Sequence, residues 1–322
     1  MTAIRTLDLF CGGGGSSWGA RAAGADIVAG VDAWELATST FGDNFPGAKA
    51  ITQRISERSQ FDVLEHLAPF DLILASPECT NHSCARGARE RDEESRRTAF
   101  HVLRYVRHFQ PRWVILENVV HMRSWHGYQQ LVDTLQSDFH YHVDCQFLNA
   151  ADFGVPQARK RLFIICDRER PIPPIARLPG AKRRTARTVI DPAGTWHAGP
   201  LDNGRRAKRT LRRASRAMAE LGPAVPFLIV YYGSDGSGGW QTLDQPLRTV
   251  TTLDRFGLVS YRKAVPTLRM LQVPELTRAM GFSKKSCVQL ERGTRRDRIK
   301  LLGNGVCPPV MEAIVLAITN RS

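Results

Sequence analysis

The stretch Asp8-Leu9-Phe10-Cys11-Gly12-Gly13-Gly14-Gly15 is the most informative segment for the architecture of this chain. It ends an apolar segment, Ile4–Phe10, that is typical of a buried strand, and it leads into a predicted helix over Ser16–Ala23. Glycines at such a junction let the backbone turn sharply and approach a ligand closely. Free N–H groups at the start of the helix favour an anionic group. A glycine loop also suits a dinucleotide or a bare tight turn, so alone it predicts only a strand–turn–helix unit.

Strand and helix patterns alternate through the first half of the chain. The further predicted strands are Ala25–Asp32, Phe70–Ser76, Trp113–Glu117, His142–Leu148 and Leu162–Asp167, and the further predicted helices are Glu35–Phe41, Glu94–Phe109 and Gln129–Asp138. This alternation predicts an α/β fold, a parallel sheet with helices on both faces. Asp32 ends the second strand, where a carboxylate can hold ribose hydroxyls. This half therefore predicts a site for an adenosine-containing cofactor.

The pattern changes after Asp167. Four prolines between residues 171 and 179 interrupt regular structure, and the tract Arg205–Arg216 carries seven Arg or Lys residues. Short strands are then predicted at Phe227–Tyr232, Leu247–Leu253 and Leu258–Tyr261. We expect a catalytic, cofactor-binding domain over residues 1–167 with 300–322, and a small basic β-containing domain over 168–299. The apolar helix predicted at Pro308–Ile318 returns to the first domain.

Charge and cysteine content narrow the class of protein. The 322 residues include 45 Lys and Arg against 31 Asp and Glu, a net charge of +14. Such an excess suits a polyanionic partner, because neutralising phosphates releases counterions. No run approaches the roughly 18–20 apolar residues of a membrane helix. The seven cysteines are odd in number and scattered without zinc-ligand spacing, so we expect free thiols, a reducing cytoplasm and no metal site.

Two groups with chemical potential follow neighbouring predicted strands. Asp71–Ser76 leads into Pro77-Glu78-Cys79-Thr80, and the strand through Val114–Leu116 ends at Glu117. Adjacent parallel strands would bring Cys79 and Glu117 to the same edge of the sheet. A thiol beside an acid suits covalent attack on an electron-poor ring. A lone cysteine is more often an inert buried residue, and the nearby His82 and Cys84 do not complete a metal site.

Five blocks, taken together, resemble the bacterial and phage DNA (cytosine-5)-methyltransferase family. They are DLFCGGGG (8–15), PEC (77–79), ENV (117–119), FGVPQARKR (153–161) and LGNGV (302–306), in the family's order and spacing. The resemblance implies a Rossmann-like S-adenosylmethionine (SAM)-dependent methyltransferase sheet with a smaller target-recognition domain. It implies transfer of a methyl group from SAM to carbon 5 of a cytosine flipped out of double-stranded DNA.

The resemblance also assigns roles to residues of this chain. The implied catalytic residues are Cys79, which attacks carbon 6, Glu117, which binds ring N3, Arg159 and Arg161. The implied cofactor-binding residues are Phe10, Cys11, Gly12, Gly13, Gly14, Asp32, Ala33, Ile51, Pro77, Asn304, Gly305 and Val306. We expect DNA contacts from Gln157, Arg248, Thr249, Arg205, Arg206 and Lys208. The family further implies a cytoplasmic monomer of a bacterial or phage-infected cell, with no membrane partner and a place for a cognate restriction endonuclease.

Three positions depart from the family pattern. Glu78 precedes Cys79 where a second proline is usual, and a carboxylate there tends to raise a thiol pKa. Ala50 stands before Ile51 where an acid is usual, and Ala33 follows Asp32 where an aromatic residue is usual, with Trp34 one place later. Because of these departures, a methyl donor related to SAM is kept as an alternative to SAM itself. The alternative functions are an RNA cytosine-5 methyltransferase on the same fold, a catalytically inactive DNA-binding protein and a nicotinamide-dependent oxidoreductase.

Overall fold

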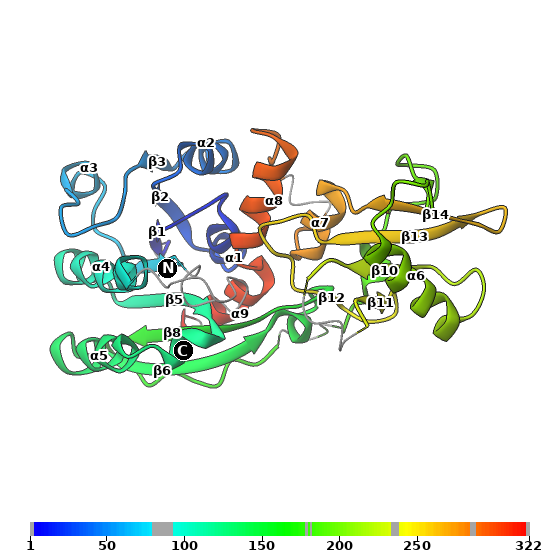
Figure 1. The fold of residues 1–322 in the computed structure, drawn as a ribbon. Helices are drawn as coiled ribbons and strands as arrows, with labels where there is room; N and C mark the ends of the chain where they lie inside the picture. The colour runs from blue at the N-terminus through cyan, green and yellow to red at the C-terminus, as the bar shows by residue number, and fades with distance from the viewer. Residues whose placement is uncertain are drawn as a thin grey trace.

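A seven-stranded sheet forms the larger part of the molecule (Figure 1). The computed structural model describes residues 3–78, 93–177, 180, 182–232, 238–283 and 288–319, with only the backbone of 93–97. The strand order is β3-β2-β1-β4-β5-β8-β6. The strands are β1 (Arg5–Leu9), β2 (Asp26–Asp32), β3 (Lys49–Thr52), β4 (Leu72–Ala75), β5 (Trp113–Val119), β6 (His142–Asn149) and β8 (Lys160–Asp167).

Helices cover both faces of this sheet. Apolar side chains of α1 (Gly15–Ala22), α2 (Glu35–Asn44) and α9 (Pro308–Thr319) pack with one face. Those of α3 (Asp62–Glu65), α4 (Glu93–Phe109) and α5 (Gly127–Asp133) pack with the other. The central strands β1, β4, β5 and β8 are buried on both sides, which explains their near-continuous apolar sequences. The predicted fold class, a Rossmann-like sheet between two layers of helices, is confirmed.

The sheet is not parallel throughout, and this part of the prediction was wrong. β8 pairs antiparallel with both of its neighbours, β5 and β6. Between the end of β6 and the start of β8 lie only η4 (Ala150–Phe153) and the short β7 (Gln157–Ala158). A parallel neighbour needs a crossover connection of about a dozen residues or more, usually a helix. The short connection therefore returns the chain in the opposite direction.

Most predicted elements of the first half are confirmed. The short α3 and β7 were not predicted, and two further differences concern β3 and the helix after β5. β3 (Lys49–Thr52) was not predicted, because it is a four-residue edge strand whose side chains are only partly buried. The predicted helix Gln129–Asp138 begins earlier as α5 and continues as a π-helical turn, η3 (Thr134–Asp138). Neither difference moves the edge of the sheet at which the predicted site lies.

A five-stranded antiparallel sheet forms the second part, at the right of Figure 1. Its order is β11 (Trp240–Thr242), β10 (Phe227–Val230), β13 (Phe256–Arg262), β14 (Val265–Met270) and β9 (Gly199–Pro200). The helix α6 (Lys208–Leu221) packs on one face through Ala214 and Ala217. The predicted strand Leu247–Leu253 is shorter than expected: β12 (Leu247–Arg248) leaves this sheet and pairs with β7.

The two parts share a hydrophobic core. One cluster of buried residues joins Phe163 and Val310 of the larger part to Leu228, Val250 and Phe256 of the smaller part. The helix α8 (Arg295–Asn304) follows α7 (Val273–Ala279) and runs across residue 299, where the sequence placed the domain boundary. The predicted final helix is confirmed as α9. A Cβ on Gly19 of α1 would lie 2.4 Å from the Pro308 carbonyl oxygen, so α1 and α9 touch closely.

Within the described part of the chain, one stretch is long and apolar enough to qualify as a candidate membrane span. It is Arg295–Thr319, with a mean hydropathy of 1.7 over its window, of which 61% is buried inside the protein. It comprises α8 and α9, which are interrupted at Gly305 by an extended backbone (φ −69°, ψ 156°). The core helices of globular proteins satisfy the same length and composition test.

Candidate active site

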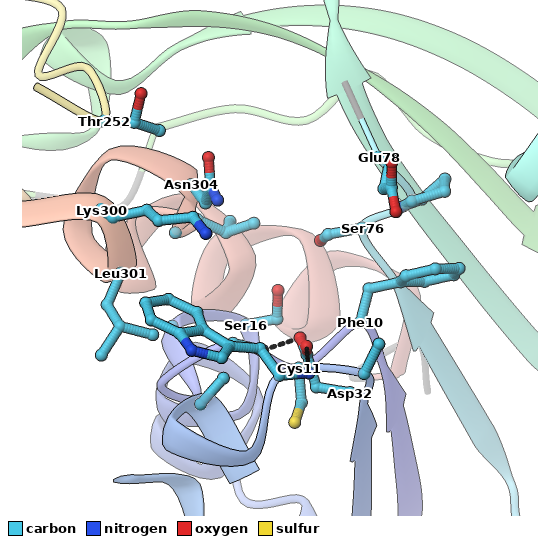
Figure 2. A pocket seen from close by; sticks show the side chains of 18 of the residues that line it. Phe10, Cys11, Ser16, Asp32, Ser76, Glu78, Thr252, Lys300, Leu301 and Asn304 are labelled. Atoms are coloured by element: carbon cyan, nitrogen blue, oxygen red, sulfur yellow. Dashed lines mark hydrogen bonds between the residues drawn. The ribbon is translucent and has the colours of Figure 1, made fainter. Parts of the chain in front are cut away.

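A cavity of about 850 Å³ lies at the carboxyl ends of β1, β2 and β4, beside α8 (Figure 2). Ligands of open α/β sheets bind at this edge. Most of the predicted cofactor residues line the cavity: Phe10, Cys11, Gly12, Asp32, Ala33, Pro77, Asn304, Gly305 and Val306. Gly13, Gly14 and Ile51 are not among its lining residues. The glycine loop and the LGNGV block, far apart in the sequence, thus face one cavity.

The glycine loop has a shape that other residues would strain. Gly12 and Gly14 have φ values of 53° and 89°, in the left-handed region. A Cβ on Gly14 would lie 2.4 Å from the Phe45 ring, and a Cβ on Gly15 would lie 2.5 Å from the Val306 carbonyl oxygen. Gly14 therefore shapes the turn, whereas Gly15 lets the LGNGV block lie against the first turn of α1.

The Asp32 carboxylate is fixed at the end of β2. Its two oxygens accept hydrogen bonds from the backbone N–H groups of Gly12 (3.0 Å) and Trp34 (2.9 Å). Burial raises the pKa of Asp32, these backbone hydrogen bonds oppose the rise, and the charge of Glu78 adds to it. A carboxylate held in this way at the cavity wall can accept hydrogen bonds from ribose hydroxyls.

A second carboxyl group lies buried under the first turn of α1. Asp8 of β1 accepts a 2.6 Å hydrogen bond from the Ser17 hydroxyl, while its other oxygen, Oδ1, is buried without a hydrogen-bond partner. Burial raises the pKa of Asp8 to about 7; the hydrogen bond from Ser17 lowers this pKa, and the negative charge of Asp32 raises it further. Ser16, next to Ser17, lines the cavity. The Asp8–Ser17 contact thus helps to position a wall of the site.

Trp34, next to the start of α2, and Lys300 of α8 both line the cavity and are in contact. The Lys300 ammonium lies 4.2 Å from the centroid of the Trp34 ring. Figure 2 shows Lys300, Leu301 and Asn304 reaching into the cavity from α8. Trp34 supplies the aromatic surface that Ala33 does not, one residue later than the family pattern. Ala50 does not line the cavity.

The turn after β4 is fastened to the end of β5. The Asn118 side-chain amide donates to the Pro77 carbonyl oxygen at 3.2 Å, and its Oδ1 accepts from the Val119 N–H at 2.8 Å. Pro77 and Glu78 line the cavity. Cys79, the predicted nucleophile, lies outside the described residues. The cavity therefore extends to the last described residue before Cys79.

Glu117 and Arg161 form an ion pair at the same edge. The Arg161 Nε lies 3.0 Å from a Glu117 carboxylate oxygen, and the Glu117 side chain is 7% exposed. Burial raises the pKa of Glu117, while the charges of Arg161 and Arg159 oppose the rise. A raised pKa favours the protonated acid, which can donate a hydrogen bond to a ring nitrogen. Glu117 also lines the cavity, so this acid and the predicted cofactor residues face one space.

Arg159, predicted to be catalytic, is a buried clamp on three backbone carbonyl groups. Its Nη1 donates to Val250 at 3.0 Å, and its Nη2 donates to Gly303 and Gly305, each at 2.9 Å. The two glycine carbonyls flank Asn304, a cavity residue. Arg159 thus fixes the backbone on both sides of Asn304 and ties it to the segment from the smaller part.

Gln157 has a similar internal role. Its side-chain amide donates to the Ala279 carbonyl oxygen at 3.0 Å, and its Oε1 accepts from the Val250 N–H at 2.9 Å. The residue is fully buried. The predicted DNA contact finds no support in this placement, because the polar atoms of Gln157 face the protein interior.

The segment that follows β12 joins the smaller part to the cavity. Thr249 donates through its hydroxyl to the Ala158 carbonyl oxygen at 2.9 Å, and Arg248 donates to the Trp240 carbonyl oxygen at 3.3 Å. Farther along, Thr252 and Leu253 line the cavity. Residues predicted to face DNA and residues facing the cofactor cavity therefore belong to one short segment.

The basic tract is divided between surface and interior. Arg205 and Lys208 are exposed. Arg206 donates to the carbonyl oxygens of Leu201 and Pro200, each at 3.1 Å. Arg213, in the middle of α6, is 5% exposed and donates to the Val230 carbonyl oxygen at 2.7 Å. Part of the positive charge therefore stabilises the smaller part instead of facing a partner.

Sequence reasoning missed several cavity residues. They are Ser16, Trp34, Ala37, Arg54, Ile55, Ser76, Thr98, Thr252, Leu253, Arg296, Asp297, Lys300 and Leu301. One signal was present, because residues 297, 300, 301 and 304 have the spacing of a single helix face. The others come from separate segments that only the fold brings together.

Among the residues that the structure describes, no group of three or more His, Cys, Asp or Glu side chains could hold a metal ion. The thiols of Cys11 and Cys307 are buried, and burial raises the pKa of Cys307 to about 11. A thiol in that state is a poor nucleophile.

The glycine loop and the buried acid of the Glu117–Arg161 pair line one cavity, which fits the methyltransferase class that the sequence resemblance implies. The C-5 cytosine-specific DNA methylase family matches residues 4–320. The chain belongs to this family, and the resemblance read from the sequence is confirmed.

Individual relatives agree with this assignment. The chain is 32% identical over 255 residues to the Type II methyltransferase M.HgiDI of Herpetosiphon aurantiacus, covering 76% of this chain and 80% of that protein. It is 31% identical over 169 residues to M.DdeI of Desulfomicrobium norvegicum, covering 50% of this chain and only 40% of the relative. The Dnmt2 methyltransferase of S. pombe has the same fold, with a TM-score of 0.69, 15% identity and 97% of each chain covered.

Proposed function

We propose that this chain methylates carbon 5 of cytosine in double-stranded DNA, with SAM as the methyl donor and Cys79 as the covalent nucleophile. The observation that carries the proposal is the position of Glu117. This buried acid lines the same cavity as Asp32, Asn304, the glycine loop and Glu78, which directly precedes Cys79 in the sequence. Family membership supplies the chemistry of the reaction.

The cavity residues fit SAM. A volume of about 850 Å³ lies within the range of small-molecule sites. We infer that Asp32 accepts the ribose hydroxyls, that the Phe10 and Trp34 rings provide apolar surface for the adenine, and that Asn304 binds near the methionine end. SAM supplies an electrophilic methyl group on its sulfonium. The pocket offers no acid at Ala50 for the adenine amine, so adenine recognition rests on other contacts.

The residues of the chain prepare the cytosine for transfer. The Cys79 thiolate adds to carbon 6 and breaks the ring's aromaticity, and the electron pair moves toward N3. Protonated Glu117 donates a hydrogen bond to N3 and stabilises that charge, while Arg161 holds Glu117 in place. Carbon 5 is then electron-rich and takes the methyl group. Loss of the carbon 5 proton to a base and expulsion of the thiolate restore the ring. The stacked duplex excludes this geometry, so the base must be flipped out.

We infer that Arg159 and Gln157 act by position instead of by touching the base. Arg159 holds the carbonyl groups on both sides of Asn304, and both side chains hold the backbone of Val250. We propose that Arg248, Thr249, Arg205 and Lys208 face the DNA. The proposed setting is a cytoplasmic monomer, and the Type II relatives support a cognate restriction endonuclease as a partner.

The test is transfer of a labelled methyl group. Purified chain is incubated with SAM carrying a labelled methyl group and with pooled duplex DNA of random sequence, and the DNA is digested to nucleosides. The proposal requires labelled 5-methyldeoxycytidine, and none with Glu117→Ala. Label in RNA alone would replace the DNA function with the RNA one. Label in neither, from a folded chain that binds DNA, would leave an inactive DNA-binding protein.

A further inference from the structure

Two exposed cations flank one aromatic ring at the edge of the larger sheet. The Arg123 guanidinium lies 5.6 Å from the centroid of the Phe147 ring, and the Lys160 ammonium lies 5.5 Å from the same centroid. Both basic side chains are exposed. We call Arg123, Phe147 and Lys160 the Phe147 ridge. The ring restrains two side chains that would otherwise move freely, so their charges are held close together.

The strand register places the Phe147 ridge beside the Glu117–Arg161 pair. Val119, at the end of β5, pairs with Arg161 at the start of β8, and Arg161 pairs with Leu148 near the end of β6. These three strand ends therefore share the edge at which the cavity opens. Arg123 follows directly, in η2 (Val120–Ser124) after β5.

The two faces of the sheet at this edge differ in their side chains. Neighbouring residues of a strand point to opposite faces. Lys160 is next to Arg161 in β8, and Phe147 is next to Leu148 in β6, so the ridge lies on the face opposite to Arg161. Phe147 packs with the cluster that includes Leu162 and Met122, on the α4 and α5 side. The edge therefore carries Arg161 on one face and two further cations on the other.

Among the described residues, neither ridge cation has a carboxylate partner. In the described part of the chain, no salt bridge or side-chain hydrogen bond involves the Arg123 guanidinium or the Lys160 ammonium. Arg187 and Arg292, which are also exposed, differ in this respect, since they pair with Asp244 and Asp43. Two cations that are restrained by one ring at this edge of the sheet, with no carboxylate partner among the described residues, call for an anionic partner.

We propose that the Phe147 ridge binds backbone phosphates of duplex DNA next to the cytosine that enters the Glu117–Arg161 site. The proposal rests on the proposed DNA function and adds a contact surface on the larger part of the protein. Charge complementarity selects the occupant, because two restrained cations suit the phosphates of a nucleic-acid strand and carry no base-reading geometry. The ridge would thus hold the flanking backbone while the base leaves the stack.

The test removes the charges and measures the salt dependence of DNA binding. The variant is Arg123→Gln/Lys160→Gln, and the probe is a fluorescent random-sequence duplex, titrated from about 50 to 200 mM salt. Each phosphate contact contributes a slope of about −0.9 in log K against log salt, which is about eightfold in affinity at 0.1 M salt. We expect the slope to become shallower by about 1.8, whatever the DNA sequence, with unchanged SAM binding. Phe147→Leu should keep the wild-type slope and lose a few-fold in affinity.

The chain offers a matched control at the opposite edge. Arg107 lies 5.5 Å from the Phe139 ring near the end of α4, and Lys49 begins β3; both are exposed. Arg107→Gln/Lys49→Gln removes the same charge, and we expect no change in slope. An unchanged slope in the ridge variant, or an equal change in the control, would overturn the proposal. Failure of the wild type to bind duplex DNA would instead remove the proposed function itself.

A charge-retaining variant separates the loss of phosphate contacts from any change in folding. Arg123→Lys/Lys160→Arg retains both charges, and it should restore the wild-type slope. If it behaves like the Gln variant, the effect comes from packing around Phe147 and the phosphate contact is refuted. Turnover at saturating DNA should stay near wild type for the Gln variant while the KM for DNA rises, because neither cation faces Glu117.

Discussion

Replacement of Arg159 by lysine should weaken SAM binding even though Arg159 does not line the cavity. Its guanidinium holds three backbone carbonyl groups, two of which flank Asn304. Lysine keeps the charge but has a single nitrogen on a flexible stem, and it cannot reproduce the planar fork. It can satisfy one carbonyl group well and leaves the others without their donor. Asn304 then loses its fixed position at the cavity wall.

The size of the effect follows from the buried hydrogen bonds. Arg159 is 3% exposed, so each lost bond leaves an acceptor away from water. A hydrogen bond to a charged group contributes about 1.5–3 kcal/mol, and losing two of three predicts about 3–6 kcal/mol less stability. If displacement of Asn304 weakens SAM binding by about 1.4 kcal/mol of that total, the dissociation constant for SAM rises about tenfold.

Isothermal titration of SAM into each variant measures this effect, with urea unfolding as the stability arm. Arg161→Lys is the matched control, because Arg161 pairs with Glu117 and donates to neither glycine carbonyl. We expect Arg161→Lys to bind SAM within about twofold of wild type and to lose turnover. A folded Arg159→Lys protein that binds SAM like wild type would refute the positioning role of Arg159.

Three further predictions concern the same region. Glu117→Gln should lower kcat about a hundredfold or more with SAM binding unchanged. Because burial holds the pKa of Glu117 above its ordinary value, the wild-type rate should also fall as pH rises through that pKa. A Gln variant whose rate still falls in the same alkaline range would contradict the assignment. Asp8→Asn should remove a pH dependence of the free energy of unfolding. The folded-state pKa of Asp8, about 7, exceeds its ordinary value of 3.8, so the native state binds a proton that the unfolded state has lost. Wild-type stability in urea unfolding should therefore fall by about 4 kcal/mol as pH rises from about 4 to 7, and the variant should not show this fall. Gly19→Ala should cost about 1–3 kcal/mol in thermal unfolding, because its Cβ would lie 2.4 Å from the Pro308 carbonyl oxygen, and an unchanged melting temperature would show that α1 and α9 separate easily.

The fold could be read from the sequence wherever local pattern and tertiary position agree. The strands through Leu9, Asp32 and Ala75 are short apolar runs bounded by turn signals, and the structure places them side by side in the sheet. The reversal at β8 could not be read, because an antiparallel strand between two helical layers has the same apolar sequence as a parallel one. Only the short connection from Asn149 to Lys160 carried that information.

The site residues that lie in recognisable blocks of sequence could be predicted. Asp32 and Asn304 line the cavity, and both could be predicted, because Asp32 ends a predicted strand and Asn304 lies in the LGNGV block. Trp34 and Lys300 were missed, because their contact joins two segments more than 260 residues apart. The Gln157 prediction came from the family resemblance of its block, whereas its burial and its hydrogen bonds to Val250 and Ala279 are properties of the assembled fold.

The measurement that separates this mechanism from its alternatives is a covalent adduct at Cys79. Duplex DNA with 5-fluorocytosine in many sequence contexts is incubated with the chain and SAM, and the products are resolved under denaturing conditions. Fluorine at carbon 5 cannot leave as a proton does, so the thiolate stays bound to carbon 6. We expect a DNA-linked protein whose modified peptide contains Cys79, and no such species with Cys79→Ala. An adduct mapped to another cysteine, or active methyl transfer that persists in Cys79→Ala, would contradict the mechanism.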